Sequence, residues 1–234
     1  MQRLDKIISS QLNISRSIAR NDIRVGKVFV DGQLVRDPSF QTNPEKALIK
    51  HCGQPVGYKE YVYILLNKPK GVLSASEDKK RETVVDLVPE TLRRPNIAPV
   101  GRLDKDTTGL LILTDDGDFA HRVISPKKNV VKTYKVWLDG EVTEEMCGKF
   151  ADGITLADGT KCRPAELIIL EDKVAEIKIS EGKYHQIKRM FGTVGLGVDG
   201  LERRAIGKLW LPENLGIGCC RELTKPELEQ IFSN

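Results

Sequence analysis

Apolar and polar positions alternate with helical spacing at the amino terminus of the chain. The apolar residues of the first predicted helix share one face: Leu4, Ile7, Ile8 and Leu12. A second helix is predicted from Ser15, a residue type that caps helices, to about Val25. Two short apolar runs then flank Asp31-Gly32, a dipeptide typical of tight hairpins. Residues 1–43 are therefore predicted to form a small unit of two helices and a hairpin.

The segment that follows differs in composition from the first 43 residues. Residues 44–60 are rich in Gly and Pro, with Gly53, Pro55 and Gly57 close together. This composition predicts a linker over 44–60, followed by a second domain over 61–234.

The second domain shows several strand-like runs, separated by turns. The predicted strands are 61–66, 110–113, 132–138, 165–170, 174–180, a run around 204, and 209–211. The predicted helices are 83–88, 119–124, 143–151, 183–191 and a last one that opens with a capping box at Thr224. Because strands outnumber helices and the two do not alternate strictly, the pattern favours an α+β domain on a mixed, largely antiparallel sheet.

Composition narrows the class of protein. The 234 residues are 40% hydrophobic, which suffices for a substantial core. No apolar run approaches the roughly 20 residues that span a bilayer, and the amino terminus lacks the apolar segment of a signal peptide. We therefore expect a cytoplasmic protein with no membrane partner. Five cysteines without CxxC spacing and three scattered histidines indicate neither disulfides nor a metal site.

Positive charge is concentrated near the amino terminus. Residues 1–43 carry seven Lys and Arg against four Asp and Glu, whereas residues 61–234 carry 27 of each. On the second predicted helix, Arg16, Arg20 and Arg24 fall four residues apart and so share a face. Such a row is either a solvated helix face or a surface for a polyanion.

A polar loop stands out in the second domain. Residues 98–117 contain Arg102, Asp104 and Asp106 between two glycines, followed directly by the apolar run 110–113. A polar entrance to a buried strand is a common place for functional residues. If the segment is extended, the three charged side chains share one side. A surface ion pair, a metal-binding pair of aspartates and a catalytic carboxylate all remain open from the residues alone.

Other candidates are each ambiguous. Lys68 and Lys70 in the turn after the first strand could be solvated or could touch phosphate. Tyr134 suits the core of a strand, His185 either caps a helix or meets phosphate, and Lys188 borders an apolar helix stripe.

Two sets of motifs resemble known families. Residues 1–43, from Gln2-Arg-Leu-Asp-Lys through Ser15-Arg16 to Lys27-Val-Phe-Val-Asp-Gly, resemble the S4-type RNA-binding domain. The segments beginning at Asn67, Gly101, Lys132 and Glu181 (NKPKG, GRLDKDTTGL, KTY, EGKYHQIKRM) resemble, in order, the RNA pseudouridine synthases. The likeness is greatest to the family of ribosomal small-subunit pseudouridine synthase A.

This resemblance implies an enzyme that converts a uridine of 16S ribosomal RNA to its C-glycoside isomer, without cofactor or metal. It implies that Asp104 is catalytic, that Tyr134 packs on the base, and that Lys188 pairs with the aspartate; Arg102 is the other candidate partner. The residues expected to contact RNA are Arg16, Arg20, Arg24, Lys27, Lys68, Arg102 and His185. A sister enzyme for 23S RNA and a non-catalytic RNA-binding assembly factor are the alternatives. The expected substrate is a partly assembled small subunit, and the expected state is a monomer.

Overall fold

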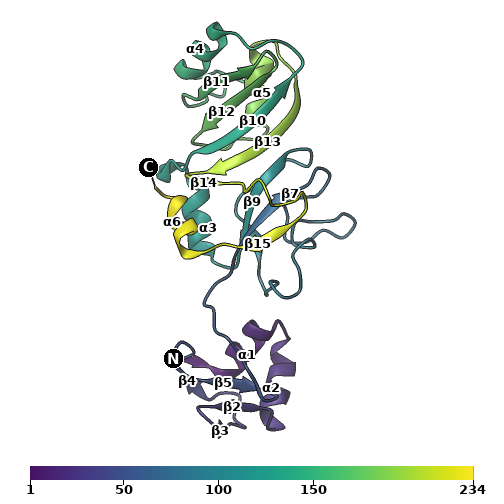
Figure 1. Ribbon diagram of the computed structural model, residues 1–234, viewed down its shortest axis with the longest axis vertical. Helices are drawn as coiled ribbons and strands as arrows, with labels where there is room; N and C mark the ends of the chain where they lie inside the picture. Colours follow the sequence, from purple (N-terminus) through teal and green to yellow (C-terminus); the bar gives the residue numbers. More distant parts are fainter. Residues whose placement is uncertain (234) are drawn as a thin grey trace. The chain divides into compact units, whose positions relative to one another are not determined.

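The computed structural model describes residues 1–233, which divide into two compact units (Figure 1). The first unit holds residues 1–62 together with 90–96, and the second holds residues 63–89 and the chain from 97 onward.

Two helices and a small sheet make the first unit. The helices are α1 (Leu4–Leu12) and α2 (Arg16–Arg24), and the hydroxyl of Ser15 caps α2 by accepting from the backbone of Ile18. The elements of the four-stranded sheet, in spatial order, are β3 (Gln33–Leu34), β2 (Val28–Val30), β5 (Ile49–His51) and β6 (Gln54–Pro55). A separate pair joins β1 (Gln2–Arg3) to β4 (Gln41–Thr42). The predicted hairpin is confirmed, because Asp31 and Gly32 have φ of 51° and 82° between β2 and β3.

The predicted linker is wrong. Residues 44–60 contain β5 and β6, and β5 pairs with β2 of the hairpin, so this segment is part of the first unit. Residues 90–96 also join that unit, since Arg94 donates to the backbone oxygen of Lys59 at 2.7 Å and to the side chain of Gln11. Strands of two or three residues are too short to show the apolar alternation by which strands are recognised in a sequence.

A mixed sheet organises the second unit. In spatial order its main strands are β11 (Glu166–Glu171), β12 (Val174–Ile179), β10 (Lys132–Leu138), β13 (Val198–Ile206), β9 (Thr108–Thr114), β7 (Tyr63–Lys68) and β15 (Cys220–Glu222). Two short strands attach at its side, β8 (Ala98–Pro99) to β9 and β14 (Leu209–Trp210) to β13. Neighbouring strands are antiparallel except β9 and β13, which are parallel. The predicted mixed, largely antiparallel sheet is confirmed.

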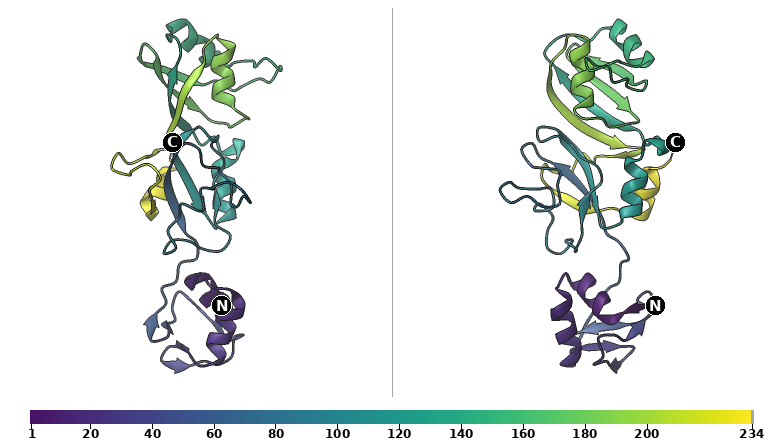
Figure 2. Two further views of the ribbon diagram at one scale, coloured as in Figure 1. Left: turned by 90° about the vertical axis from the view of Figure 1, so that its right-hand side faces the viewer. Right: turned by 180° about the vertical axis from the view of Figure 1, so that it is seen from behind.

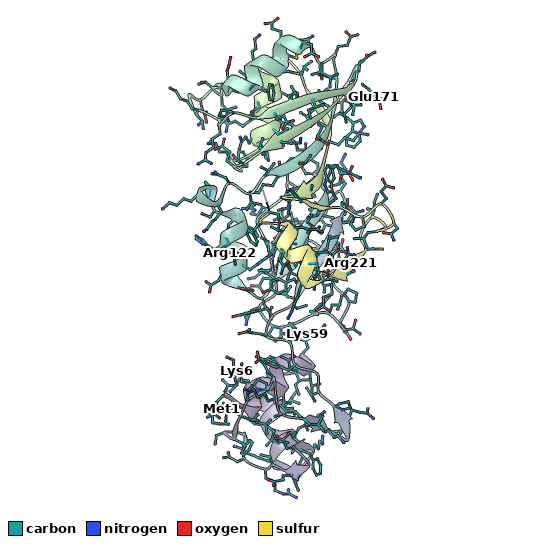
Figure 3. All side chains as sticks on the ribbon, turned by 60° about the vertical axis from the view of Figure 1, so that its left-hand side comes forward. Met1, Lys6, Lys59, Arg122, Glu171 and Arg221 are labelled. Carbon is teal, nitrogen blue, oxygen red and sulfur yellow. The ribbon has the colours of Figure 1, made fainter. Side chains whose placement is uncertain are left out.

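Helices cover both halves of this sheet. They are α3 (Gly117–Ile124), α4 (Glu144–Asp152), α5 (Gln186–Thr193) and α6 (Lys225–Gln230), with a 3-10 turn at Pro126–Lys128. In the left view of Figure 2, α3 and α5 lie on one side of the sheet and α6 on the other. Arg221 of β15, labelled in Figure 3, holds α6 by binding Glu227 at 2.6 Å. Over residues 83–88, where a helix is predicted, the chain forms turns instead.

None of the helices in the described part of the chain is long and apolar enough to cross a membrane.

Candidate active site

The polar loop predicted from the sequence connects β8 to β9 and is not extended. Gly101 and Gly109 at its two ends have φ of 75° and 96°, a region that L side chains rarely adopt. At Gly109 a side chain would also collide with β13, because a Cβ atom would lie 2.3 Å from the backbone oxygen of Arg203. Within the loop, Thr107 N donates to Asp104 O at 3.1 Å and closes a turn. Gly109, at the contact of β9 with β13, thus fixes the point at which the loop ends and the chain enters the sheet.

Lys68, at the end of β7, lies beneath this loop. Its side chain is fully buried, and Nζ donates to the backbone oxygens of Pro69 (3.0 Å), Thr107 (3.0 Å) and Lys105 (3.4 Å). The expectation that Lys68 contacts RNA is wrong, because the loop encloses its ammonium group. Burial lowers the pKa of Lys68 to about 8, and the negative charges of Asp106 and Asp104 oppose that shift.

Ser74 fixes the residue that precedes Asp104. Its hydroxyl donates to Leu103 O at 2.8 Å and accepts from Leu103 N at 3.1 Å, while the Leu103 side chain is buried. Gly71 N donates to Lys105 O at 2.7 Å on the other side. The backbone around Asp104 is therefore held by hydrogen bonds from the segment after β7, a role of Ser74 that sequence reasoning missed.

The Asp104 carboxylate faces His185. Oδ1 of Asp104 lies 3.4 Å from Nε2 of His185, and both side chains are about one-third exposed. His185 is the residue before α5 and adopts φ of 47°, a conformation that is strained for a non-glycine residue. The predicted helix 183–191 thus begins three residues later than expected, and its first predicted turn instead aims the imidazole at Asp104.

Lys188, in the first turn of α5, binds a different aspartate from the one expected. Its Nζ lies 2.6 Å from both carboxylate oxygens of Asp106. This hydrogen bond holds the pKa of Asp106 below its usual range. The expected pairing of Lys188 or Arg102 with Asp104 is not formed here: Lys188 binds Asp106, and Arg102 is exposed at the wall of the neighbouring cavity.

A cavity of about 810 Å³ opens beside Asp104. Its wall includes the loop residues Arg102 and Asp104, Tyr134 of β10, and His185 and Lys188 from the region of α5. This size accommodates a nucleotide. The arrangement presents an aromatic ring, a carboxylate and several cationic groups to one ligand, which suits a negatively charged substrate with a flat ring.

The segment that leads into α5 is itself held in place. Gln186 is buried; its amide nitrogen donates to Glu181 at 2.8 Å, and its amide oxygen accepts from Lys183 N at 2.9 Å. Glu181 also binds the Lys183 ammonium group. These bonds leave Tyr184 77% exposed at the cavity wall, stacked on His185 with ring centroids 3.9 Å apart. Nothing in the spacing of the sequence distinguished Tyr184 from an ordinary surface residue.

Two arginines of the row on α2 are held by an aspartate of α1. Arg16 and Arg20 each bind Asp5 of α1 at 3.0 Å, and Arg3 binds it at 3.1 Å. These hydrogen bonds, that from Arg3 first, hold the pKa of Asp5 well below its usual range although its side chain is buried. The side chains of Arg3, Arg16 and Arg20 stay 42–50% exposed, and together they leave a net positive charge at the surface.

The other two predicted contacts lie near this row. Arg24 is exposed at the end of α2, whereas Lys27 binds Asp22 at 2.7 Å. RNA contact by Arg16, Arg20, Arg24 and Lys27 stays a prediction.

Comparison with known proteins identifies the family and the domains of the chain. A family described as RNA pseudouridylate synthase matches residues 62–193, and the S4 domain matches residues 2–46. The chain belongs to the RNA pseudouridylate synthase family and carries an amino-terminal S4 domain. It is an enzyme of that family in fold and sequence, as the motifs predict.

Individual relatives match over nearly the whole chain. An uncharacterized RNA pseudouridine synthase of Bacillus subtilis (strain 168) is 40% identical, covering 97% of this chain and 96% of that protein. Ribosomal small subunit pseudouridine synthase A of Escherichia coli (strain K12) is 40% identical, covering 98% and 99%. A crystal structure of a pseudouridylate synthase aligns over 99% of this chain and 100% of the other, with 38% identity and a TM-score of 0.69.

Proposed function

We propose that this protein isomerises one uridine of small-subunit (16S) ribosomal RNA to pseudouridine, with Asp104 acting at C1′ of the ribose. The observation that carries the proposal is the Asp104 carboxylate at the wall of a nucleotide-sized cavity that also contains Tyr134. Relatives 40% identical over the full length are named for the small subunit, which supports the choice of RNA. Action on ribosomal RNA would place the enzyme in the cytoplasm.

The chemistry requires one bond to break and another to form at the same carbon. The N1–C1′ bond breaks, and its electron pair leaves with the uracil ring as an anion. Positive charge develops at C1′, where the Asp104 carboxylate stabilises it or adds through an oxygen. After the ring turns, C5 bonds to C1′, the carboxylate is released, the C5 proton departs, and N1 takes up a proton. Atoms and charges balance without a redox step.

The other residues of the cavity have supporting roles in this proposal. Tyr134 stacks on the extruded base, which offsets part of the cost of unstacking it from the RNA. His185 faces Asp104 in the free protein. Lys188, which is paired with Asp106, places its ammonium group in the same region. Arg102, at the rim of the cavity, contacts the RNA backbone. Arg16, Arg20, Arg24 and Lys27 attract phosphates through the S4 domain, with no sequence reading required of them.

Mapping pseudouridines in cells tests the choice of RNA. Ribosomal RNA from cells with and without the protein is treated with carbodiimide and read by reverse transcription. We expect one stop in small-subunit RNA to vanish in the absence of the protein and to return with the wild-type gene, but not with Asp104→Asn. A stop lost from large-subunit RNA would instead support the alternative of a 23S enzyme, and an unchanged pattern would contradict both.

Reconstitution tests the form of the substrate. We propose that the protein acts as a monomer on a partly assembled small subunit, without a cofactor. Assays of purified protein on free 16S RNA and on an assembly particle, with no added cofactor, should show faster conversion of the particle; equal rates would contradict that preference.

A further inference from the structure

Two buried cations lie on the floor of the active-site cavity and do not take part in the roles described above. Lys132 of β10 and Arg203 of β13 are only 9% and 4% exposed, yet both line the cavity. Tyr134 is two residues from Lys132 on the same face of β10, and it is the cross-strand partner of Arg203. The Arg203 guanidinium carbon lies 6.0 Å from the centre of the Tyr134 ring. The two cations therefore flank the ring on which the base is proposed to stack.

Neither cation has an acidic partner among the described residues. Lys132 Nζ donates to Val123 O at a long 3.3 Å, and Arg203 Nε donates to Leu110 O at 2.7 Å. Nη2 of Arg203 is buried without any hydrogen-bond partner.

The carboxylates of the cavity wall are engaged elsewhere. Asp78 binds Arg81 at 3.0 Å, Glu181 binds Lys183, and Asp104 faces His185. The floor of the cavity thus carries uncompensated positive charge.

This arrangement costs folding free energy. Burial of a charged group without a counter-ion is unfavourable, and two neighbouring cations repel each other. The same physics lowers the pKa of Lys132 to about 8, through burial first and the charge of Arg203 second. A packed sheet does not need such a pair, because Met or Leu would fill the same space without that cost. The positive charge therefore points to an anionic ligand or an anionic reaction stage.

We propose that Lys132 and Arg203 stabilise the negative charge that develops on the uracil ring when the N1–C1′ bond breaks. This inference rests on the proposed function. The electron pair of the broken bond is delocalised over the ring and its O2 and O4 atoms, and returns to the new bond when C5 attacks C1′. Fixed cations in a site shielded from water lower the energy of such an anion without reorganising during the reaction.

A phosphate group is the other anion that the reacting nucleotide offers. A phosphate carries its charge before and after bond cleavage, so cations that bind it strengthen RNA affinity. The charge on uracil exists only once the bond is breaking, so cations that stabilise it raise the rate without raising the affinity. The position of both groups beside Tyr134, beneath the base, favours the uracil ring.

The test compares Lys132→Met with a matched control, Lys135→Met. Both lysines lie on β10, but Lys135 is on the opposite face, with its ammonium group 5.1 Å from the Trp137 ring. Binding and single-turnover conversion are measured with the ribosomal RNA that the wild-type protein modifies, transcribed with either uridine or 5-fluorouridine. Fluorine withdraws electrons and makes the uracil anion a better leaving group, so it should reduce the need for the cations. Loss of the N-glycoside is followed by mass spectrometry of nuclease digests.

We expect Lys132→Met to bind RNA with a Kd within about 2-fold of wild type and to cleave the uridine bond about 10- to 1000-fold more slowly. The loss should be clearly smaller with 5-fluorouridine, and Lys135→Met should match wild type on both. The melting temperature of Lys132→Met should equal or exceed that of the wild type. Arg203→Lys, which keeps the charge, should retain more activity than Arg203→Met, with Arg204→Gln as the control.

Three results would overturn the inference. If Lys132→Met binds RNA and cleaves the uridine bond as the wild type does, the lysine has no role in the reaction. If it loses equal activity on uridine and 5-fluorouridine and has a lower melting temperature, its role is structural. If it binds RNA more weakly but cleaves at the wild-type rate, the cations bind a phosphate. A wild-type protein that converts no uridine would instead contradict the proposed function, so the two failures are distinguishable.

Discussion

The ammonium group of Lys68 holds the loop that carries Asp104. It donates to three backbone oxygens, two of them from the loop itself. We expect Lys68→Met to leave these acceptors unpaired and to reduce the free energy of unfolding by about 1–3 kcal/mol. Turnover should fall as the loop loosens. Lys70→Met, in the same turn but exposed, should change neither quantity in urea unfolding and activity assays. Equal stability of the two variants would contradict this account of Lys68.

Lys132 should give the stability of the protein a characteristic dependence on pH. Its pKa is about 8 in the folded protein and 10.5 without perturbation. Between these values the unfolded chain binds a proton that the folded chain lacks, so the folded state gains stability as the pH rises. The penalty from Lys132 is therefore complete below about pH 8 and disappears towards pH 10.5. In thermal unfolding, Lys132→Met should have a higher melting temperature than the wild type at pH 7, and this difference should become smaller by pH 10. A difference that stays constant with pH would argue against a buried charge at Lys132.

For single residues, the sequence indicates which ones belong to the candidate site better than it indicates which other residues they contact. The polar loop bounded by glycines that runs into a buried strand is predicted from the residue pattern, and the structure has that loop; the choice of Asp104 within it comes from the family resemblance. The pairing of Lys188 with Asp106, and of His185 with Asp104, depends on where α5 docks, which local spacing does not encode. Ser74 and Lys68 act through backbone groups about 30 to 40 residues away, and a single sequence contains no local signal for such contacts.

Among the elements, the parallel contact of β9 with β13 places the active-site loop. Gly109 allows this contact, since its Cβ would overlap the backbone of Arg203 and its φ is 96°. We expect Gly109→Ala to reduce the free energy of unfolding by about 2–5 kcal/mol through overlap and backbone strain. Gly117→Ala is the matched control, because nothing lies within 4 Å of the added methyl group and the residue begins α3. Chemical denaturation should separate the two variants, and similar midpoints would contradict the close approach.

Elements with clear periodicity could be predicted closely, and those set by tertiary contacts could not. The predicted strand 132–138 coincides with β10, and the first predicted helix coincides with α1. By contrast, α5 starts late because His185 takes a left-handed conformation, and residues 83–88 form turns beside the isolated bridge of Leu73 to Thr83. Where a linker is predicted, the chain forms β5 and β6. Composition does not reveal these short strands, because they are set by the pairing of β5 with β2 of the hairpin and of β6 with β5.

For the whole molecule, the charge is divided between the two units, and this division predicts a separation of binding from catalysis. Arg24 is exposed on α2, in the S4 domain, and among residues 1–233 it is not paired with an acid. We expect Arg24→Gln to weaken RNA binding at moderate salt and to lower the slope of log K against log salt by about one. The single-turnover rate at saturating RNA should not change.

The matched control removes a lysine from the surface of the catalytic unit. Lys149 of α4 is paired with Glu145 at 2.7 Å and does not line the cavity. Lys149→Gln should leave the salt slope as it is in wild type. If both variants lower the slope equally, the S4 domain has no special part in phosphate attraction.

The central claim is that the negative charge of Asp104 carries out the step at C1′. Asp104→Asn keeps the shape of the side chain and removes that charge, and Asp118→Asn, at an exposed position of α3, is the control. The measurement is tritium release from C5-labelled uridine in ribosomal RNA, with RNA affinity determined in parallel. We predict that Asp104→Asn binds RNA within about 2-fold of wild type and releases tritium about 1000-fold more slowly or not at all, while Asp118→Asn is unaffected. Release by Asp104→Asn at a rate near that of the wild type would contradict the account.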